Sequence, residues 1–206
     1  MPDSRDSRTA ILARIAAAAQ STPTAPVPRA YRRTRELGDL VALAEDRIAD
    51  YRATVHVIPN TELVRRIKDV LTERVAHHML APAGLPAEWR VEGVTWLVDE
   101  PPLSVDELDR AGGVLTGCAL VIAETGTIVL DAGPDQGRRA LTLIPDYHLC
   151  VVRAEQIVGT VPEAIAKLDP VRPTTFISGP SATSDIEFNR VEGVHGPRTL
   201  DVLVTT

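Results

Sequence analysis

The chain has 206 residues, of which 44% are hydrophobic, so it is long enough to bury a core of its own. Its formal net charge of −6 argues against a general nucleic-acid-binding protein. It contains no uninterrupted apolar run of about 18 residues, which argues against a transmembrane helix. The two cysteines, Cys118 and Cys150, lie in separate apolar runs without metal-ligand spacing. We therefore expect buried reduced thiols, no metal site and a cytoplasmic protein.

The N-terminal segment differs from the rest of the chain. Residues 8–20 have the pattern of one helix, and a proline-rich linker follows at 21–30. We expect a helical extension and linker over 1–30 and a single domain over 31–206. Residues 1–35 carry a net charge of +5, which leaves −11 for the remainder. Such a basic arm could pack on its own domain or on a neighbouring subunit, and a solvated tail is an equal alternative.

The middle of the chain alternates helices and strands. Apolar residues at helical spacing predict helices over 37–52 and 62–75, the second capped by Asn60 or Thr61, with a strand over 54–60 between them. A short strand, "VTWLVDE", comes next. The sequence "SVDELDR" then has the spacing of a capping box, in which a serine is followed three residues later by a glutamate.

The last ninety residues are richer in strand patterns. Two strand runs meet at Glu124, and a further apolar strand region is interrupted at Pro145. The later elements are expected as a short helix, a buried strand, another helix and a last strand, at 161–168, 174–179, 180–190 and 199–206. This alternation predicts parallel β-α-β units, and hence an α/β fold with a doubly wound, mainly parallel sheet that is covered on both faces.

Glu124 is the most unusual residue of this region, because it lies between two apolar strand runs and is followed by Thr125 and Gly126. A carboxylate in such a place costs several kcal/mol unless it is paired, solvated or protonated. One interpretation is a strand end facing a cleft, where Glu124 acts as a base, nucleophile or ligand clamp. The alternative is a buried ion pair with Arg138 or Arg139.

A second candidate site is the segment "ISGPSATSDIE", where a strand is expected to lead into a helix. A helix start that follows glycine and is rich in hydroxyl groups can hold an anion, and ordinary helix capping is the alternative. The candidates here are Ser178, Gly179, Ser181, Thr183 and Asp185. No phosphate-loop lysine and no glycine fingerprint of a nucleotide site are present.

A third segment, "EGVHGPRTL", offers His195 and Arg198 on a glycine-flanked loop, although a loop histidine is often structural. Loops that leave the carboxyl ends of parallel strands lie on one edge of a sheet. We therefore expect the three segments to meet in one cleft, where Glu124 faces a small anion.

Two long stretches carry a resemblance to a known family. The sequences "TGCALVIAETGTIVLDAGPDQGRRALTLIPDYHLCVV" and "FISGPSATSDIEFNRVEGVHGPRTLDVLV" resemble the LUD domain of lactate utilisation protein C (LutC, YkgG-like). The resemblance implies a fold like that of the NagB/RpiA/CoA-transferase group. It also implies a role in oxidising L-lactate to pyruvate beside LutA-like and LutB-like partners. These partners carry the iron–sulfur clusters, and this chain lacks the clustered cysteines needed to hold one.

The resemblance supplies no catalytic residue. Glu124-Thr125-Gly126 is similar to the Glu-Asn-Gly turn that some CoA-transferases of the same broad fold use as acyl acceptor. A free-standing enzyme of acyl transfer or sugar-phosphate isomerisation is therefore an alternative to a subunit of a lactate-oxidising system.

Overall fold

The computed structural model describes residues 4–19, 26, 30–180, 182–183, 191–192 and 196–206. The chain separates into two units, Met1–Arg32 and Arg33–Thr206. The first contains helix α1, Ser4–Ala19, which begins four residues before the predicted start. None of the helices in these ranges is long and apolar enough to cross a membrane.

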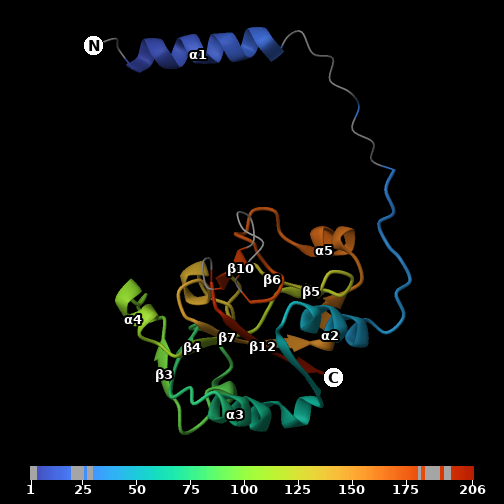
Figure 1. Ribbon diagram of the computed structural model, residues 1–206, viewed down its shortest axis with the longest axis vertical. Coiled ribbons are helices and arrows are strands. Elements are labelled where there is room, and N and C mark those ends of the chain that lie inside the picture. The colour runs from blue at the N-terminus through green and yellow to red at the C-terminus, as the bar shows by residue number, and fades with distance from the viewer. Residues whose placement is uncertain (1–3, 20–25, 27–29, 181, 184–190, 193–195) are drawn as a thin grey trace. The chain divides into compact units, whose positions relative to one another are not determined.

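The second unit is built on a six-stranded sheet in which every neighbouring pair of strands is parallel (Figure 1). This arrangement confirms the predicted α/β fold with a mainly parallel sheet. Its strands, in spatial order, are β1 (Thr54–Ile58), β12 (Thr199–Thr205), β7 (Tyr147–Arg153), β4 (Gly113–Thr116), β2 (His78–Ala81) and β3 (Thr95–Val98).

Side chains of the central strands alternate between two apolar layers, as the period of a strand requires. On one face, Leu149, Val151 and Leu203 pack against helix α3 (Leu63–Glu73). On the other face lies a second core, which also takes side chains from helix α2 (Leu40–Asp50). From the central strands it receives Cys150, Val152, Val202 and Val204. Figure 1 shows α3 below the sheet and the second layer above it.

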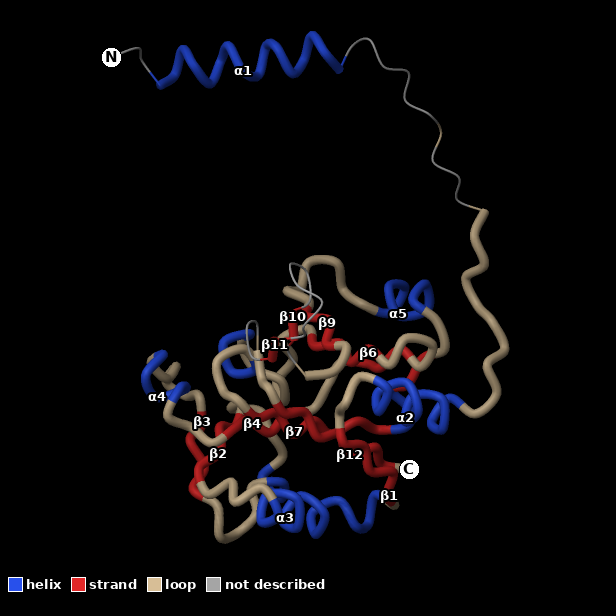
Figure 2. The backbone as a smooth tube through the Cα atoms, viewed as in Figure 1, coloured by secondary structure: helices blue, strands red, loops and turns tan. Residues whose placement is uncertain are grey.

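The second layer is itself a sheet, which the sequence did not lead us to expect (Figure 2). Strands β5 and β6 form an antiparallel hairpin, β9 adds antiparallel to β6, and β8 lies parallel to β5. Helix α5 packs on its outer face through the buried Ala164. The bounds are β8 (Ile157–Val158), β5 (Leu120–Ile122), β6 (Thr127–Leu130), β9 (Thr175–Ile177) and α5 (Val161–Lys167).

The prediction of parallel β-α-β units throughout the last third is therefore wrong for β9. This strand lies at an edge, and Phe176 is 50% exposed, so the predicted buried strand is only partly buried. The helix predicted after it is also contradicted at its start, since Ala182–Thr183 form strand β10, antiparallel to β11 (Val191–Glu192). The hairpin signal was present in Gly126, whose φ of +62° permits a tight reversal.

Among the described helices, α4 starts as the sequence predicts and α3 does not. The capping box of Ser104 and Glu107 is confirmed at helix α4 (Val105–Asp109). The predicted cap of α3 is wrong, because a 3-10 turn at Asn60–Glu62 precedes that helix and supplies no side-chain cap. The remaining 3-10 turns are Ala87–Trp89, Arg139–Thr142 and Ala154–Gln156.

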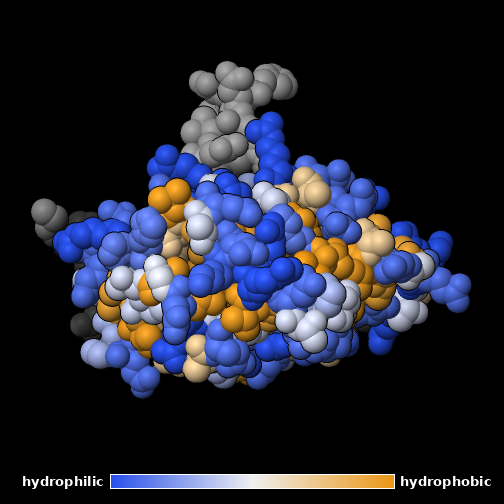
Figure 3. All heavy atoms as spheres, turned by 90° about the horizontal axis from the view of Figure 1, so that it is seen from below, coloured by the Kyte–Doolittle hydropathy of each residue, from blue (hydrophilic) through white to orange (hydrophobic). Residues whose placement is uncertain are grey.

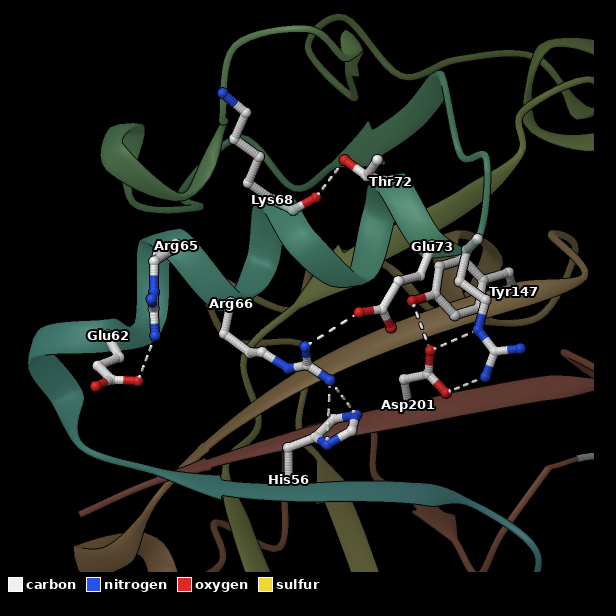
Figure 4. A network of polar contacts seen from close by, with 10 residues as sticks. His56, Glu62, Arg65, Arg66, Lys68, Thr72, Glu73, Tyr147 and Asp201 are labelled. Atoms are coloured by element: carbon white, nitrogen blue, oxygen red, sulfur yellow. Dashed lines mark hydrogen bonds and ion pairs between the residues drawn. The ribbon is translucent and has the colours of Figure 1, made fainter.

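A buried carboxylate on β12 links the end of helix α3 to the six-stranded sheet (Figure 4). The side chain of Asp201 is 2% exposed, and it accepts two hydrogen bonds from Arg74, at 2.8 and 2.6 Å. The hydroxyl of Tyr147 donates a third, at 3.0 Å. Burial raises the pKa of Tyr147 far above its usual value, so the phenol remains a donor. The outer surface on this side of the domain is mostly hydrophilic, with apolar patches between (Figure 3).

We predict that Arg74→Met lowers the free energy of unfolding by about 2–3 kcal/mol, because it leaves the Asp201 carboxylate buried without its cation. Arg65→Met is the matched control, since Arg65 forms an exposed ion pair with Glu62 on the same helix. The control should change stability by about 0.5 kcal/mol or less. Urea denaturation followed by tryptophan fluorescence measures both, and equal effects would contradict the prediction.

Candidate functional site

Glu124 lies in the turn of the β5–β6 hairpin and is paired with an arginine from another part of the chain. Its Oε1 is 3.2 Å from Nη2 of Arg35, and the two side chains are 35% and 53% exposed. The segment before α2 positions Arg35, because the Arg33 carbonyl accepts a hydrogen bond from the Thr160 hydroxyl at 3.0 Å. Glu124 thus stays within reach of solvent, and its charge is neither isolated nor deeply buried.

The two arginines suggested by the sequence as partners of Glu124 are not its partners. Arg138 donates two hydrogen bonds to the carboxylate of Asp99, at 2.8 and 3.0 Å, and a third to the Leu103 carbonyl. This pair lowers the pKa of Asp99, although desolvation acts in the opposite direction. The Arg35 interaction could not be read from the sequence, since 89 residues separate it from Glu124.

A row of hydroxyl groups leads away from the Glu124 turn. The Thr125 hydroxyl is 2.7 Å from that of Thr127, which is 3.0 Å from that of Ser178. The structure thus brings Thr125 and Ser178 together, as expected, but through the antiparallel pairing of β6 with β9 rather than through a common edge of the parallel sheet. Thr127 was missed, although its spacing of two from Thr125 places both on one face of a strand.

Two glycines allow the Glu124 turn and the end of β9, which together we call the Glu124 corner, to pack closely on α2. Gly126 and Gly179 have φ angles of +62° and +81°. A Cβ atom on Gly126 would lie 2.5 Å from the Arg47 carbonyl, and one on Gly179 would lie 2.7 Å from the Tyr51 carbonyl. Both predicted glycines therefore serve close packing of the hairpin and of the end of β9 on the helix.

The other predicted residues do not join this group in the part of the chain that the structure describes. Arg198 precedes β12 and pairs with Asp146 at 3.2 Å on the surface. Thr183 belongs to β10. Ser181, Asp185 and His195 lie outside the described residues, so their predicted roles remain predictions. Among described residues, no three His, Cys, Asp or Glu side chains are arranged to hold a metal ion.

Ser178 and Gly179 also line a cavity of about 320 Å³ between β9 and the six-stranded sheet. Its other walls come from the segments that precede or begin β7 and β12, so it lies near the amino ends of these parallel strands.

At the opposite edge of the sheet, the Gly117 and Gly84 amides donate hydrogen bonds to the carbonyls of Asp135 and Pro134, at 2.9 and 3.1 Å. The chain's own loop thus covers the carboxyl ends of β2 and β4, the edge at which open α/β sheets commonly bind ligands.

One wall of the cavity contains a buried histidine. His148 is 1% exposed, and its Nε2 lies 2.7 Å from the Thr116 hydroxyl. Burial lowers the pKa of His148 to about 4, so the imidazole is neutral at pH 7.

Comparison with known proteins gives consistent matches. The sequence model of the LUD domain family matches residues 104–205. A Deinococcus radiodurans protein named lactate utilization protein C is 52% identical over 189 residues, which cover 90% of this chain and 86% of that one. A Bacillus subtilis protein of the same name is 31% identical over 124 residues, and this chain spans about half of its length, 51%.

A solved structure also matches the fold. The crystal structure of a DUF162 family protein from Deinococcus radiodurans superposes with a TM-score of 0.70 at 46% sequence identity. The match covers 88% of this chain and 100% of that one.

We predict that Gly126→Ala destabilises the domain by about 3 kcal/mol, because it combines a left-handed backbone with overlap against Arg47. Gly38→Ala is the control: Gly38 has a φ of +70° but no atom within 4 Å of the added Cβ. That variant should lose only about 1 kcal/mol. Thermal and urea unfolding compare the two, and similar losses would show that the packing on α2 is unimportant.

We further predict that stability falls as the pH drops from about 6.5 towards 4. An unfolded histidine binds a proton near pH 6.5, whereas folded His148 resists protonation until about pH 4, so protons favour the unfolded state in this window. The full effect is of order 3 kcal/mol. His148→Gln should lose less stability than the wild type between pH 7 and pH 4, whereas His77→Gln, with the buried imidazole intact, should behave as the wild type. Equal acid sensitivity of all three proteins would refute this account.

Proposed function

We propose that the chain, which belongs to the LUD-domain family, acts in lactate utilisation. In this role it would be a subunit of a system that oxidises L-lactate to pyruvate. The observation that carries this proposal is the 52% identity, over 90% of the chain, with a protein named lactate utilization protein C. The proposed location is the cytoplasm.

The electrons of this oxidation are proposed to pass to iron–sulfur partners of the LutA and LutB kinds. Conversion of lactate to pyruvate releases two electrons and two protons, so the system needs an electron acceptor. The two cysteines of this chain are fewer than the four thiolates of a common iron–sulfur cluster. Both are buried, and a hydrogen bond with Cys150 together with burial raises the pKa of Cys118 far above its usual value. Cys118 therefore does not offer a ready metal-binding thiolate.

The Glu124 corner supplies groups suited to a small hydroxy acid. Arg35 is half-exposed and could take the substrate carboxylate, and Glu124 beside it could accept the proton of the substrate hydroxyl. The hydroxyls of Thr125, Thr127 and Ser178 continue from the same turn and offer further donors. Within this proposal, Glu124 is the catalytic residue and Arg35 the residue that binds the anion.

A second candidate function is acyl transfer, which the position of Glu124 in a Glu-Thr-Gly hairpin turn favours. The exposed carboxylate oxygen could attack the carbonyl carbon of a thioester, forming a glutamyl anhydride while the thiolate leaves. Incubation with an acyl-CoA should then release free CoA thiol, which a thiol reagent detects. Lactate-dependent growth without any such release favours the first function.

We predict that Glu124→Gln folds normally but abolishes lactate-dependent growth when it replaces the wild-type copy, because the amide can neither accept a proton nor attack a carbonyl. Glu62→Gln is the matched control: Glu62 forms an exposed ion pair with Arg65 at the start of α3, on the other face of the six-stranded sheet. The control should support growth at the wild-type rate, and both variants should melt within a few degrees of the wild type. Full growth of Glu124→Gln would remove Glu124 from the proposed site.

A further inference from the structure

The turn that carries Glu124 is attached to the short segment between β8 and helix α5, which we call the β8–α5 junction (residues 158–160). The backbone amides of Ala123 and Glu124 donate hydrogen bonds to the Val158 and Gly159 carbonyls, at 2.8 and 3.1 Å. These bonds continue the parallel pairing of β5 with β8. They fix the backbone of the turn and leave the Glu124 carboxylate unused.

The segment that carries Arg35 is attached to the same junction. The side chain of Thr160, a residue that is 6% exposed, donates its hydroxyl hydrogen bond to the Arg33 carbonyl at 3.0 Å. Leu37 also lies against the junction, since a Cβ atom on Gly159 would be 3.4 Å from its Cδ1. Both members of the ion pair therefore depend on one short piece of backbone.

Helix α5 holds the junction in place. The Glu163 carboxylate accepts hydrogen bonds from the Gly159 and Thr160 amides, at 2.8 and 3.1 Å, in a capping box at the start of the helix. The Arg35–Glu124 pair itself is 53% and 35% exposed, and exposed ion pairs contribute little to holding two long side chains in one geometry. The backbone attachments therefore set the geometry of the pair.

We propose that Thr160 is a positioning residue of the Glu124 site, which holds Arg35 where it binds the carboxylate of the substrate. This proposal rests on the function proposed above. Thr160 holds the Arg35 segment through one hydroxyl, whereas Glu124 is held by separate backbone hydrogen bonds. Loss of the hydroxyl thus displaces the anion-binding group and leaves the base in place. Since a shift of about 1 Å is enough to disturb a site, Thr160 determines the affinity for lactate and not the rate of proton transfer.

The first test measures the attachment without using any activity. The Arg33 carbonyl belongs to the peptide bond that trypsin cleaves between Arg33 and Thr34, so the Thr160 hydroxyl protects this bond. In the full chain, Thr160→Val should be cleaved there about fivefold faster than the wild type, because local opening no longer breaks a hydrogen bond. Thr160→Ser keeps the hydroxyl and should be cleaved as the wild type is. Mass spectrometry identifies the bond, and cleavage after Arg14 is the internal reference.

The second test measures lactate-dependent reduction of a dye in extracts of cells in which each variant replaces the wild-type copy. Thr160→Val should raise the KM for lactate about tenfold and keep the maximal rate within about twofold of the wild type. Thr160→Ala, which lacks the hydroxyl and adds no bulk, should behave in the same way, and Thr160→Ser should restore the KM.

Ser104→Ala is the matched control, because it removes the hydroxyl of the α4 capping box in another part of the domain. This variant and Thr160→Val both lose a capping hydroxyl, so a rise in KM confined to Thr160→Val comes from the lost bond to Arg33.

Each failure has its own signature. Unchanged cleavage of Thr160→Val between Arg33 and Thr34 would overturn the attachment. An unchanged KM, or a fall in the maximal rate without a rise in KM, would overturn the positioning role. Failure of the proposed function shows instead as full growth of Glu124→Gln on lactate, whatever the trypsin result, so the two failures are distinguishable.

Discussion

The burial of β7 and β12 on both faces is the constraint on which the domain depends. Their side chains alternate between an α3 layer, with Leu149 and Leu203, and a second layer, with Cys150 and Val202. A parallel sheet is stable only when both of its faces are covered. Helix α3 packs on one face, and on the other face α2 shares the cover with the hairpin of β5 and β6.

This second layer decides where the candidate chemistry lies. The hairpin must reverse at the edge of the layer, so the turn that carries Glu124 reaches the surface next to the segment that carries Arg35. Strand β9 then adds to β6 and brings Ser178 beside Thr127. The glycines at 126 and 179 let both segments approach α2 closely. The corner is thus a consequence of covering the sheet, and its polar groups are placed by apolar packing.

Local signals in the sequence were sufficient for many elements and for the fold class. The helical spacing before Asp50, the apolar run of the last strand and the Ser104–Glu107 box all depend on neighbours a few residues away. The partner of Glu124 and the sheet to which β9 belongs depend on residues far away in sequence, and no spacing rule contains that information. The candidate site was therefore predicted in part: Thr125 and Ser178 meet, but for a different topological reason, while Arg198 pairs with Asp146.

The pairing of the first strand of the sheet with the last has a kinetic meaning. Thr54 of β1 aligns with Asp201 of β12, so the edge strand finds its only described neighbour 147 residues later. Arg74 and Tyr147 likewise cannot form their hydrogen bonds with the Asp201 carboxylate until β12 is in place. Contacts of such long sequence separation are formed late and slow the folding of a chain. During synthesis, the N-terminal half of the domain emerges from the ribosome with an unpaired strand and a half-covered sheet. Its assembly is completed only when the residues of β12 arrive.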